Sequence, residues 1–518
     1  MARAAQQRSG TQRQGRVTSV PIPLGGWNTR DAISDMRPEF ATVMDNFFPT
    51  RSKIVLRNGS EEHATGMGTT TPVETLMVYN GPTGSEMFAA AGGEVFDVSV
   101  AGAVGAAVVT GQSNDRWQWV NFGNGTNHYL FAMNGADTPL SYDGTTWGTM
   151  SITGPTAANL VWIQVHQNRL WFGEENSTKF WYLGVTTISG AATSFDLSGL
   201  MKEGGYIMAM GSWTRDGGSG MDDVAVFYTS QGEVILYSGI DPGTAADWVY
   251  IGTFKIGEPV GRRCLIKGGS DLIAISRAGL LPLGVVLPID EVQQARATVT
   301  DAINPTVTQS VIDYGANFGW QAILYPQGQY ILFNIPVQEN ETAYQYVANT
   351  VTGAWCRFLN QNANCWAVFD DDLYFGGNGG DVYKADTGRS DNGSNIEGDV
   401  QQAYSYFGAP GVYKQYKMVQ PVLASNGNIT PALIVNVDFQ DLPPSDTPSF
   451  SGNPGSLWDV ALWDVGVWGG PDSIIKDWLG AGGLGYAASL RFTVATNDLS
   501  LSWLATNYMW EPSAGSFF

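Results

Sequence analysis

The stretch from Val73 to Asp386 repeats one local plan, and this repetition constrains the fold more than any other feature. Each repeat has an aromatic-rich strand pair with alternating apolar residues, then a Gly, Asp or Asn turn and a further pair. Repeats of about 40 to 50 residues with four short strands are typical of β-propeller blades, which bury both faces only against neighbouring blades. The sequence therefore predicts a six- or seven-bladed β-propeller over residues 61–397.

The composition agrees with an all-β protein. The 518 residues include 64 glycines, 18 tryptophans, 21 tyrosines and 23 phenylalanines, and only 14% are charged. Aromatic residues favour strands, and abundant glycine permits many tight turns. We therefore expect helices to be a minority.

The formal net charge of −21 bears on possible partners. Nucleic-acid binding comes largely from Lys and Arg that neutralise phosphates, so this charge argues against a general nucleic-acid-binding surface. An acidic wall is compatible with a conduit through which DNA slides, because it repels phosphate. It is equally compatible with acidic side chains that simply keep a large protein soluble.

Two later segments depart from the repeat. Residues 289–311 are polar, non-repetitive and partly helical in pattern, so we expect an insertion that projects from the propeller toward a partner. From residue 398 to residue 518 the composition changes and alternating strands follow one another, which predicts a separate C-terminal β-sandwich. Its tryptophans five residues apart fit a sandwich core, or stacking on sugars or a partner chain; they are Trp458, Trp463 and Trp468.

The first 23 residues predict a flexible basic arm. The arm lacks the apolar core of a signal peptide, and residues 1–16 contain no acidic residue. It is either a disordered tail or a strap that docks on an acidic partner or DNA. Its arginines are Arg3, Arg8, Arg13 and Arg16.

Residues 24–60 predict a lead-in segment with a short helix and a strand. Apolar residues at i, i+3, i+4 and i+7 indicate one face of a helix, and they are Phe40, Val43, Met44 and Phe47. Residues 53–57 then read as a strand, and Asn58-Gly59 predicts a hairpin turn. We expect the beginning of the chain to close a blade by strand exchange with residues 365–384.

Enzyme motifs are weak in this sequence. Ser141 to Trp147 approaches the Asp-box of sialidase propellers, but it is one residue shorter, and such a box locks a hairpin rather than performing catalysis. A sialidase would need an arginine cluster and a tyrosine nucleophile, whereas the arginines are few and scattered along the chain. No P-loop, dinucleotide fingerprint or GxSxG motif occurs. We therefore predict that the protein is not an enzyme and needs no cofactor.

Metal-binding patterns are also weak. Residues 376–381 match one calcium-binding β-helix nonapeptide, but it occurs once, so a plain glycine turn is favoured. Asp370, Asp372 and Asp381 remain a weak candidate set for a surface calcium ion. The three histidines lack the spacing of a zinc site, and we expect His166 to lie in the core or between blades.

The cysteine count and the hydropathy bear on disulfides and membrane spans. Three cysteines form neither a disulfide framework nor a metal motif, so we expect them to be buried and reduced; they are Cys264, Cys356 and Cys365. No run approaches the roughly 18 apolar residues of a membrane span. We expect no membrane segment and synthesis in the cytoplasm.

Both ends of the chain resemble a known family. The opening LGGWNTRDAISDMRPEFATVMDNFFPTRSKIVLRNG (24–59) is similar to that of tailed-phage virion proteins. The Trp-Asp repeat of residues 458–468, followed by GLGY (483–486) and the ending YMWEP (508–512), is similar to their C-termini. The group comprises the tail nozzles and packaged-DNA stabilisation proteins of short-tailed phages, also described as head-tail hubs. The interface candidates of the lead-in are Trp27, Asn28, Phe47 and Phe48.

The resemblance implies a structural protein of the virion tail, synthesised in the host cytoplasm. It implies a homohexameric ring that extends the DNA exit channel, helps to retain packaged DNA and permits its ejection. The expected partners are adaptor and portal proteins, tail fibre or plug proteins, and double-stranded DNA that passes through the lumen without sequence-specific binding. The alternatives are a carbohydrate-binding or sialidase-like propeller that acts as a receptor-binding adhesin, or a cellular scaffold propeller.

Overall fold

The computed structural model describes residues 15–67, 71–216, 221–294, 296–450 and 472–513. The chain divides into two compact units. The smaller unit joins Met1–Arg57 to Asn395–Phe518, and the larger unit is Asn58–Ser394. Strands dominate both units, so the protein is all-β.

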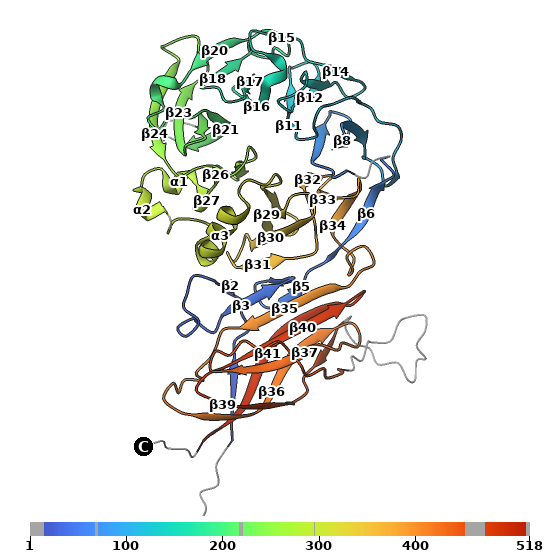
Figure 1. Cartoon of the computed structure of the whole chain (residues 1–518), viewed down its shortest axis with the longest axis vertical. Coiled ribbons are helices and arrows are strands. Elements are labelled where there is room, and N and C mark those ends of the chain that lie inside the picture. Colours follow the sequence, from blue (N-terminus) through green and yellow to red (C-terminus); the bar gives the residue numbers. More distant parts are fainter. Residues whose placement is uncertain (1–14, 68–70, 217–220, 295, 451–471, 514–518) are drawn as a thin grey trace, which may run out of the picture. The chain divides into compact units, whose positions relative to one another are not determined.

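The larger unit consists of antiparallel meanders that follow one another along the chain (Figure 1). The first three are β7–β9 (Thr75–Asn80, Ser85–Ala91, Glu94–Asp97), β11–β14 (Gln118–Gly123, His128–Met133, Leu140–Tyr142, Trp147–Thr149), and β16–β18 with β20 (Leu160–His166, Arg169–Glu174, Lys179–Tyr182, Thr193–Asp196). The short strand β15 (Ile152–Thr153) and the 3-10 turn η1 (Ala157–Asn159) precede the third meander, and η2 (Ser198–Leu200) follows it. Strand β19 (Gly190–Ala191), between β18 and β20, pairs parallel with β15.

The next three meanders continue the pattern. They are β21–β24 (Ile207–Asp216, Met221–Thr229, Glu233–Gly239, Trp248–Lys255), β25–β27 (Leu265–Gly268, Asp271–Ser276, Gly279–Pro282) and β28–β31 (Gln321–Tyr325, Tyr330–Gln338, Thr342–Asn349, Trp355–Phe358).

The last meander joins the two ends of this unit. Strands β32–β34 (Cys365–Phe369, Asp372–Gly376, Val382–Thr387) are extended by β6 (Gly59–Thr65), which pairs antiparallel with β34. A short strand, β10 (Gly102–Ala103), pairs parallel with β6. The predicted strand exchange with residues 365–384 is confirmed, although the exchanged strand begins at the end of the lead-in and lies mostly beyond it.

The meanders pack face to face in a ring-like succession. The first strand of each contacts the next meander, from β7 through β11, β16, β21, β25 and β28 to β32, and β32 contacts β7 again. Aromatic side chains fill the spaces between them, as where Phe180 stacks on Phe227 at a centroid distance of 4.7 Å. These contacts confirm the coarse prediction of an all-β, propeller-like unit.

The insertion between β27 and β28 is helical, as its pattern predicts. It contains α1 (Leu283–Val286), α2 (Glu291–Gln294), η3 (Asp301–Ile303) and α3 (Asn304–Tyr314). The prediction that it projects outward is wrong for α3, which contacts β27 and β29. Val307 and Val311 are buried, and Ser310 is hydrogen-bonded to the Tyr346 hydroxyl at 2.8 Å. The apolar side chains draw the helix onto the sheet.

The smaller unit is a β-sandwich built from both ends of the chain. One sheet contains β1 (Arg16–Val20), β4 (Phe47–Pro49), β5 (Ile54–Leu56), β36 (Lys414–Ser425), β38 (Ser473–Ile475), β39 (Leu479–Gly485) and β41 (Leu501–Pro512). The facing strands are β2 (Gly26–Trp27), β3 (Phe40–Asp45), β35 (Ile396–Gln402), β40 (Ala488–Thr496) and β37 (Ala432–Val437). Phe492 lies edge-on to both Phe47 and Trp503, at centroid distances of 5.4 and 5.0 Å, and so joins the two layers.

The predicted lead-in helix is wrong, because the segment forms β3 and β4. A β-bulge between Ala41 and Val43 shifts the alternation, so the buried residues Ala41, Met44 and Phe47 fall three apart. A bulged strand thus imitates the spacing of a helical face. The strand predicted at residues 53–57 is confirmed as β5.

Two further expectations for the N-terminal region need correction. Arg16–Val20 forms β1, which pairs with β41 along its whole length, so this part of the expected flexible arm belongs to a sheet. Asn58-Gly59 is not a hairpin turn, because β5 and β6 belong to different sheets and different units.

Candidate functional site

The larger unit contains two adjoining cavities surrounded by the first strands of its meanders. One, here the axial cavity, has a volume of about 240 Å³ and is lined from β7, β11, β16, β21, β25, β28 and β32. The other, here the mouth pocket, has a volume of about 430 Å³. Gln118, Arg262 and Arg263 line both cavities and therefore mark where they meet.

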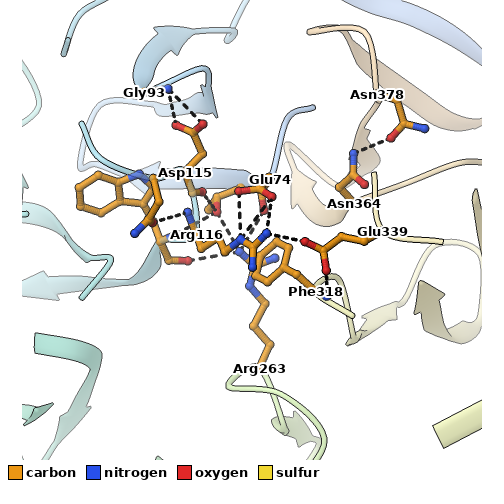
Figure 2. Close-up of polar contacts among 12 residues, drawn as sticks. Glu74, Gly93, Asp115, Arg116, Arg263, Phe318, Glu339, Asn364 and Asn378 are labelled. Atoms are coloured by element: carbon orange, nitrogen blue, oxygen red, sulfur yellow. Dashed lines mark hydrogen bonds and ion pairs between the residues drawn. The ribbon is translucent and has the colours of Figure 1, made fainter. Parts of the chain in front are cut away.

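An ion-pair cluster lies at the mouth pocket (Figure 2). Arg116 Nη2 lies 3.1 Å from Glu74 Oε1 and 2.6 Å from Glu339 Oε1. Glu74 precedes β7, Arg116 precedes β11 and Glu339 follows β29, so three meanders contribute to it. Burial lowers the pKa of Arg116, but the hydrogen bonds to the two carboxylates outweigh this and raise it. The positive charge of Arg116 is therefore neutralised within the chain.

The Phe318 ring contacts two guanidinium groups in this cluster. Its ring centroid is 4.4 Å from Arg116 Cζ and 5.0 Å from Arg263 Cζ, which is cation–π geometry. Its backbone N–H donates to Glu339 Oε2 at 2.9 Å. The next residue, Gly319, has φ +117°, a conformation that a side chain would strain. These contacts fix the loop before β28 across the pocket.

Arg262 and Arg263 are bound differently from Arg116. Arg263 Nη2 donates to Thr75 Oγ1 at 2.8 Å, to Glu74 O at 3.1 Å and to Trp117 O at 3.3 Å, all uncharged oxygens. Arg262 Nη2 reaches Glu175 Oε1 at 3.3 Å. Burial lowers the pKa of both arginines. Arg262 is therefore paired with one partly exposed carboxylate, whereas Arg263 donates its hydrogen bonds only to uncharged oxygens.

Asp115, next to Arg116 in the sequence, is anchored by hydrogen bonds to the neighbouring meander. Both of its carboxylate oxygens accept from Gly93 N at 3.1 Å, and its backbone oxygen accepts from Thr75 Oγ1 at 2.6 Å. Burial raises the pKa of this carboxyl group. Asp115 thus ties the chain before β11 to β7 and β9 and sets the position of Arg116.

Sequence reasoning missed this arginine group. The arginines are scattered along the chain, but the fold brings Arg116, Arg262 and Arg263 to one pocket. One signal could have found them, since Arg116 and Arg263 each stand shortly before the first strand of a meander. In a propeller such positions converge around the axis.

The structure does not bring the calcium candidates into a metal site. Asp372 Oδ2 is paired with Lys384 Nζ at 2.6 Å, and Asp370 is a turn residue with φ +47°. Asp381 lies in a turn, where its backbone oxygen accepts from Gly377 N at 2.9 Å. In the described parts of the chain no group of three His, Cys, Asp or Glu residues could hold a metal ion.

The interface candidates of the lead-in are mostly internal. Trp27, Asn28 and Phe47 are at most 6% exposed, and Phe48 is partly buried, so packing accounts for the first three. Arg16 lies over the Trp510 ring with its Cζ 5.4 Å from the centroid. Arg3, Arg8, Arg13 and the tryptophans Trp458, Trp463 and Trp468 lie outside the described residues.

Several structural interpretations of motifs are confirmed. Residues 141–147 form the β13–β14 hairpin, in which Asp143 Oδ1 accepts from Thr145 N and Thr146 N. His166 is buried, its Nδ1 lies 2.9 Å from Ser212 Oγ, and burial lowers its pKa to about 4. The cysteines Cys264, Cys356 and Cys365 are buried thiols that form no disulfide with one another.

The fold and the pocket define an all-β, propeller-like protein, and comparisons with known proteins add only fold-level likenesses. No protein-family model matches the chain, and no curated protein matches it. The solved structures that it resembles include the computationally designed protein Ika8, with 11% identity, a TM-score of 0.38 and coverage of 63% of this chain and 99% of that chain.

Two natural proteins give similar values. YCF48 bound to the D1 peptide has 10% identity and a TM-score of 0.37, with coverage of 64% of this chain and 96% of that chain. BamB from Moraxella catarrhalis has 10% identity and a TM-score of 0.35, with coverage of 71% and 97%. At these scores none of the three bears on function.

One general finding concerns membranes. Among the residues that the structure describes, no helix has the length and apolar character needed to span a bilayer.

Proposed function

We propose that this chain is a non-enzymatic structural protein of a phage tail, which assembles as a homohexameric ring and serves as a nozzle or hub. In this role it extends the DNA exit channel, helps to retain packaged DNA, permits ejection and anchors tail fibres or a plug. Adaptor and portal proteins are its neighbours in the virion. The acidic net charge of −21 supports this role, because it disfavours adhesion of passing DNA.

One observation carries the proposal: the two sequence segments that resemble the phage family form a single structural unit. Strand β5 of the lead-in pairs with β41 of the C-terminal ending, where Val55 faces Ser502. Strand β1 pairs with the same strand, where Arg16 faces Trp510. A resemblance at both ends of the sequence is therefore a resemblance to one sandwich, into which the larger unit is inserted.

We further propose that the larger unit is a seven-bladed propeller closed by β6. The meanders beginning with β7, β11, β16, β21, β25, β28 and β32 supply the blades. Strand β6, the first of this unit, pairs with β34 of the last meander. This pairing stabilises a closed ring, because it joins the beginning of the unit to its end.

The DNA channel in this proposal lies between copies of the chain. The mouth pocket of about 430 Å³ has the size of a small-molecule site, and Arg116 bridges it by ion pairs to Glu74 and Glu339. A duplex cannot thread such a space. The lumen must therefore be formed by surfaces of neighbouring subunits around the axis of the ring.

The test is the assembly of the purified full-length chain. Light scattering should give the mass of six copies, and electron microscopy should show sixfold rings with an open centre. Mixing with portal and adaptor proteins of the same particle should produce a larger complex. A chain that stays monomeric at high concentration and joins neither protein would contradict the proposal.

A second candidate function is a carbohydrate-binding adhesin. The observation that favours it is the convergence of Arg116, Arg262 and Arg263 on one pocket. The lining of this pocket contains no tyrosine, so it lacks the nucleophile of a sialidase. Retention of a glycan by a monomer on an array would favour this candidate over the ring.

A further inference from the structure

Arg262 and Arg263 place guanidinium groups where the mouth pocket meets the axial cavity. A guanidinium has five N–H donors. Toward the described residues, the hydrogen bonds of both side chains come from Nη2 alone. Each side chain therefore keeps donors available to a ligand in the cavities.

The charges around these donors are unevenly balanced. Two carboxylates contact Arg116, whereas Arg263 contacts only uncharged oxygens. The partner of Arg262 is the side chain of Glu175, which is 51% exposed and screened by solvent. The Arg263 side chain is buried and donates only to uncharged oxygens, so an anion bound beside it would offset part of the cost of burying its charge.

The remaining lining suits a small polar molecule. Gln118 lines both cavities, and its side-chain amide makes no hydrogen bond to the described residues. It can donate to or accept from a hydroxyl or carbonyl group of a ligand. The volume of about 430 Å³ fits a molecule of the size of a sugar acid or a dicarboxylic acid.

We propose that the mouth pocket binds a small organic acid, with its carboxylate held by Arg262 and Arg263 and its polar body facing Gln118. A planar carboxylate matches the fork of a guanidinium in a bidentate contact. The Phe318 ring, which contacts both Arg116 and Arg263, helps to hold the Arg263 guanidinium in place for this contact. The site is a property of one chain and does not depend on ring assembly.

The test is calorimetry of the full-length chain with two matched pairs of probes, galacturonate with galactose and succinate with succinamide. In each pair the second molecule lacks the carboxylate charge. At least one acid should bind at least about tenfold more tightly than its neutral counterpart, because charge-assisted hydrogen bonds are stronger than those between neutral groups. The Arg262→Gln variant should lose this preference.

The control is Arg277→Gln in the same unit. Arg277 also forms one ion pair, with Glu258 at 3.0 Å, but its side chain is 68% exposed. This variant should bind the acids as the unaltered protein does. Thermal unfolding of Arg262→Gln should stay close to that of the control, because a half-exposed ion pair contributes little.

The inference is overturned if neither acid binds better than its neutral counterpart, or if Arg262→Gln binds both acids unchanged. Sixfold rings that bind neither acid would contradict the acid site alone. A monomer that binds an acid through Arg262 would support the site and contradict the ring.

Discussion

The two units of this chain differ in how far apart in sequence their paired strands lie. In the larger unit most pairings join consecutive strands, and β6–β34 is the long-range exception. In the smaller unit β1 and β5 pair with β41, across almost the whole chain. Local pairing leaves a repeated signal in the sequence, whereas pairing of distant ends leaves none. This difference explains why the propeller-like unit was foreseen and the composition of the sandwich was not.

The largest expected effect concerns the folding of separate fragments. Residues 58–394 should fold alone with a cooperative thermal transition, because β6 and all the meanders are present. Residues 395–518 should remain unfolded alone, because β1–β5 are missing, and should gain structure when a peptide of residues 15–57 is added. Circular dichroism and NMR chemical-shift dispersion measure both outcomes. Independent folding of residues 395–518 would show that the smaller unit does not need the N-terminal strands.

Replacing one buried tryptophan in each unit should destabilise that unit and leave the other unit unchanged. Trp171 and Trp503 are both 0% exposed, and each substitution by alanine should cost about 3–5 kcal/mol. Hydrogen exchange read by mass spectrometry should show Trp171→Ala loosening the larger unit and Trp503→Ala loosening the smaller one. The matched control is Trp478→Ala, because Trp478 is 37% exposed. Equal loosening of both units by either buried change would mean that they unfold as one.

The larger unit should lose stability in mild acid because of His166. Burial lowers the pKa of His166 to about 4 from 6.5, so the unfolded chain binds the proton first as pH falls. The free energy of unfolding should decrease between about pH 6.5 and pH 4, by up to about 3 kcal/mol. Denaturant titrations at several pH values measure this slope. His166→Gln should flatten it, and an unchanged slope would assign the effect to other groups.

The smaller unit should respond to pH in the alkaline range, with a smaller effect. Burial lowers the pKa of Lys414 to about 8 from 10.5, so between these values the unfolded chain carries the extra proton. Stability of this unit should therefore rise with pH across that window, by about 1–3 kcal/mol. Nζ keeps hydrogen bonds to Ala409 O, Val412 O and Tyr486 O, which moderates the effect. Hydrogen exchange of β36 in Lys414→Met should lack this pH dependence.

The candidate site shows the same limit of sequence reasoning. The hairpin at residues 141–147 and the buried His166 were predicted, because each depends on neighbours in one or two strands. The arginine pocket was not predicted, because Arg116 and Arg263 are separated by three whole meanders. Local sequence patterns do not show which residues from distant meanders meet in the folded protein.

The sequence by itself determined the strand-rich class and the succession of meanders, because alternation and turn residues act over a few positions. It also indicated that the beginning of the chain closes the meander at residues 365–384, but only the structure identified β6 as the strand that does so. Only the tertiary structure decided that residues 40–45 form a bulged strand rather than a helix, because β35 supplies the partner for their backbone. It alone brought both chain ends into one sandwich and the arginines to one pocket. Both depend on packing between residues far apart in the chain, and local preferences do not record such packing.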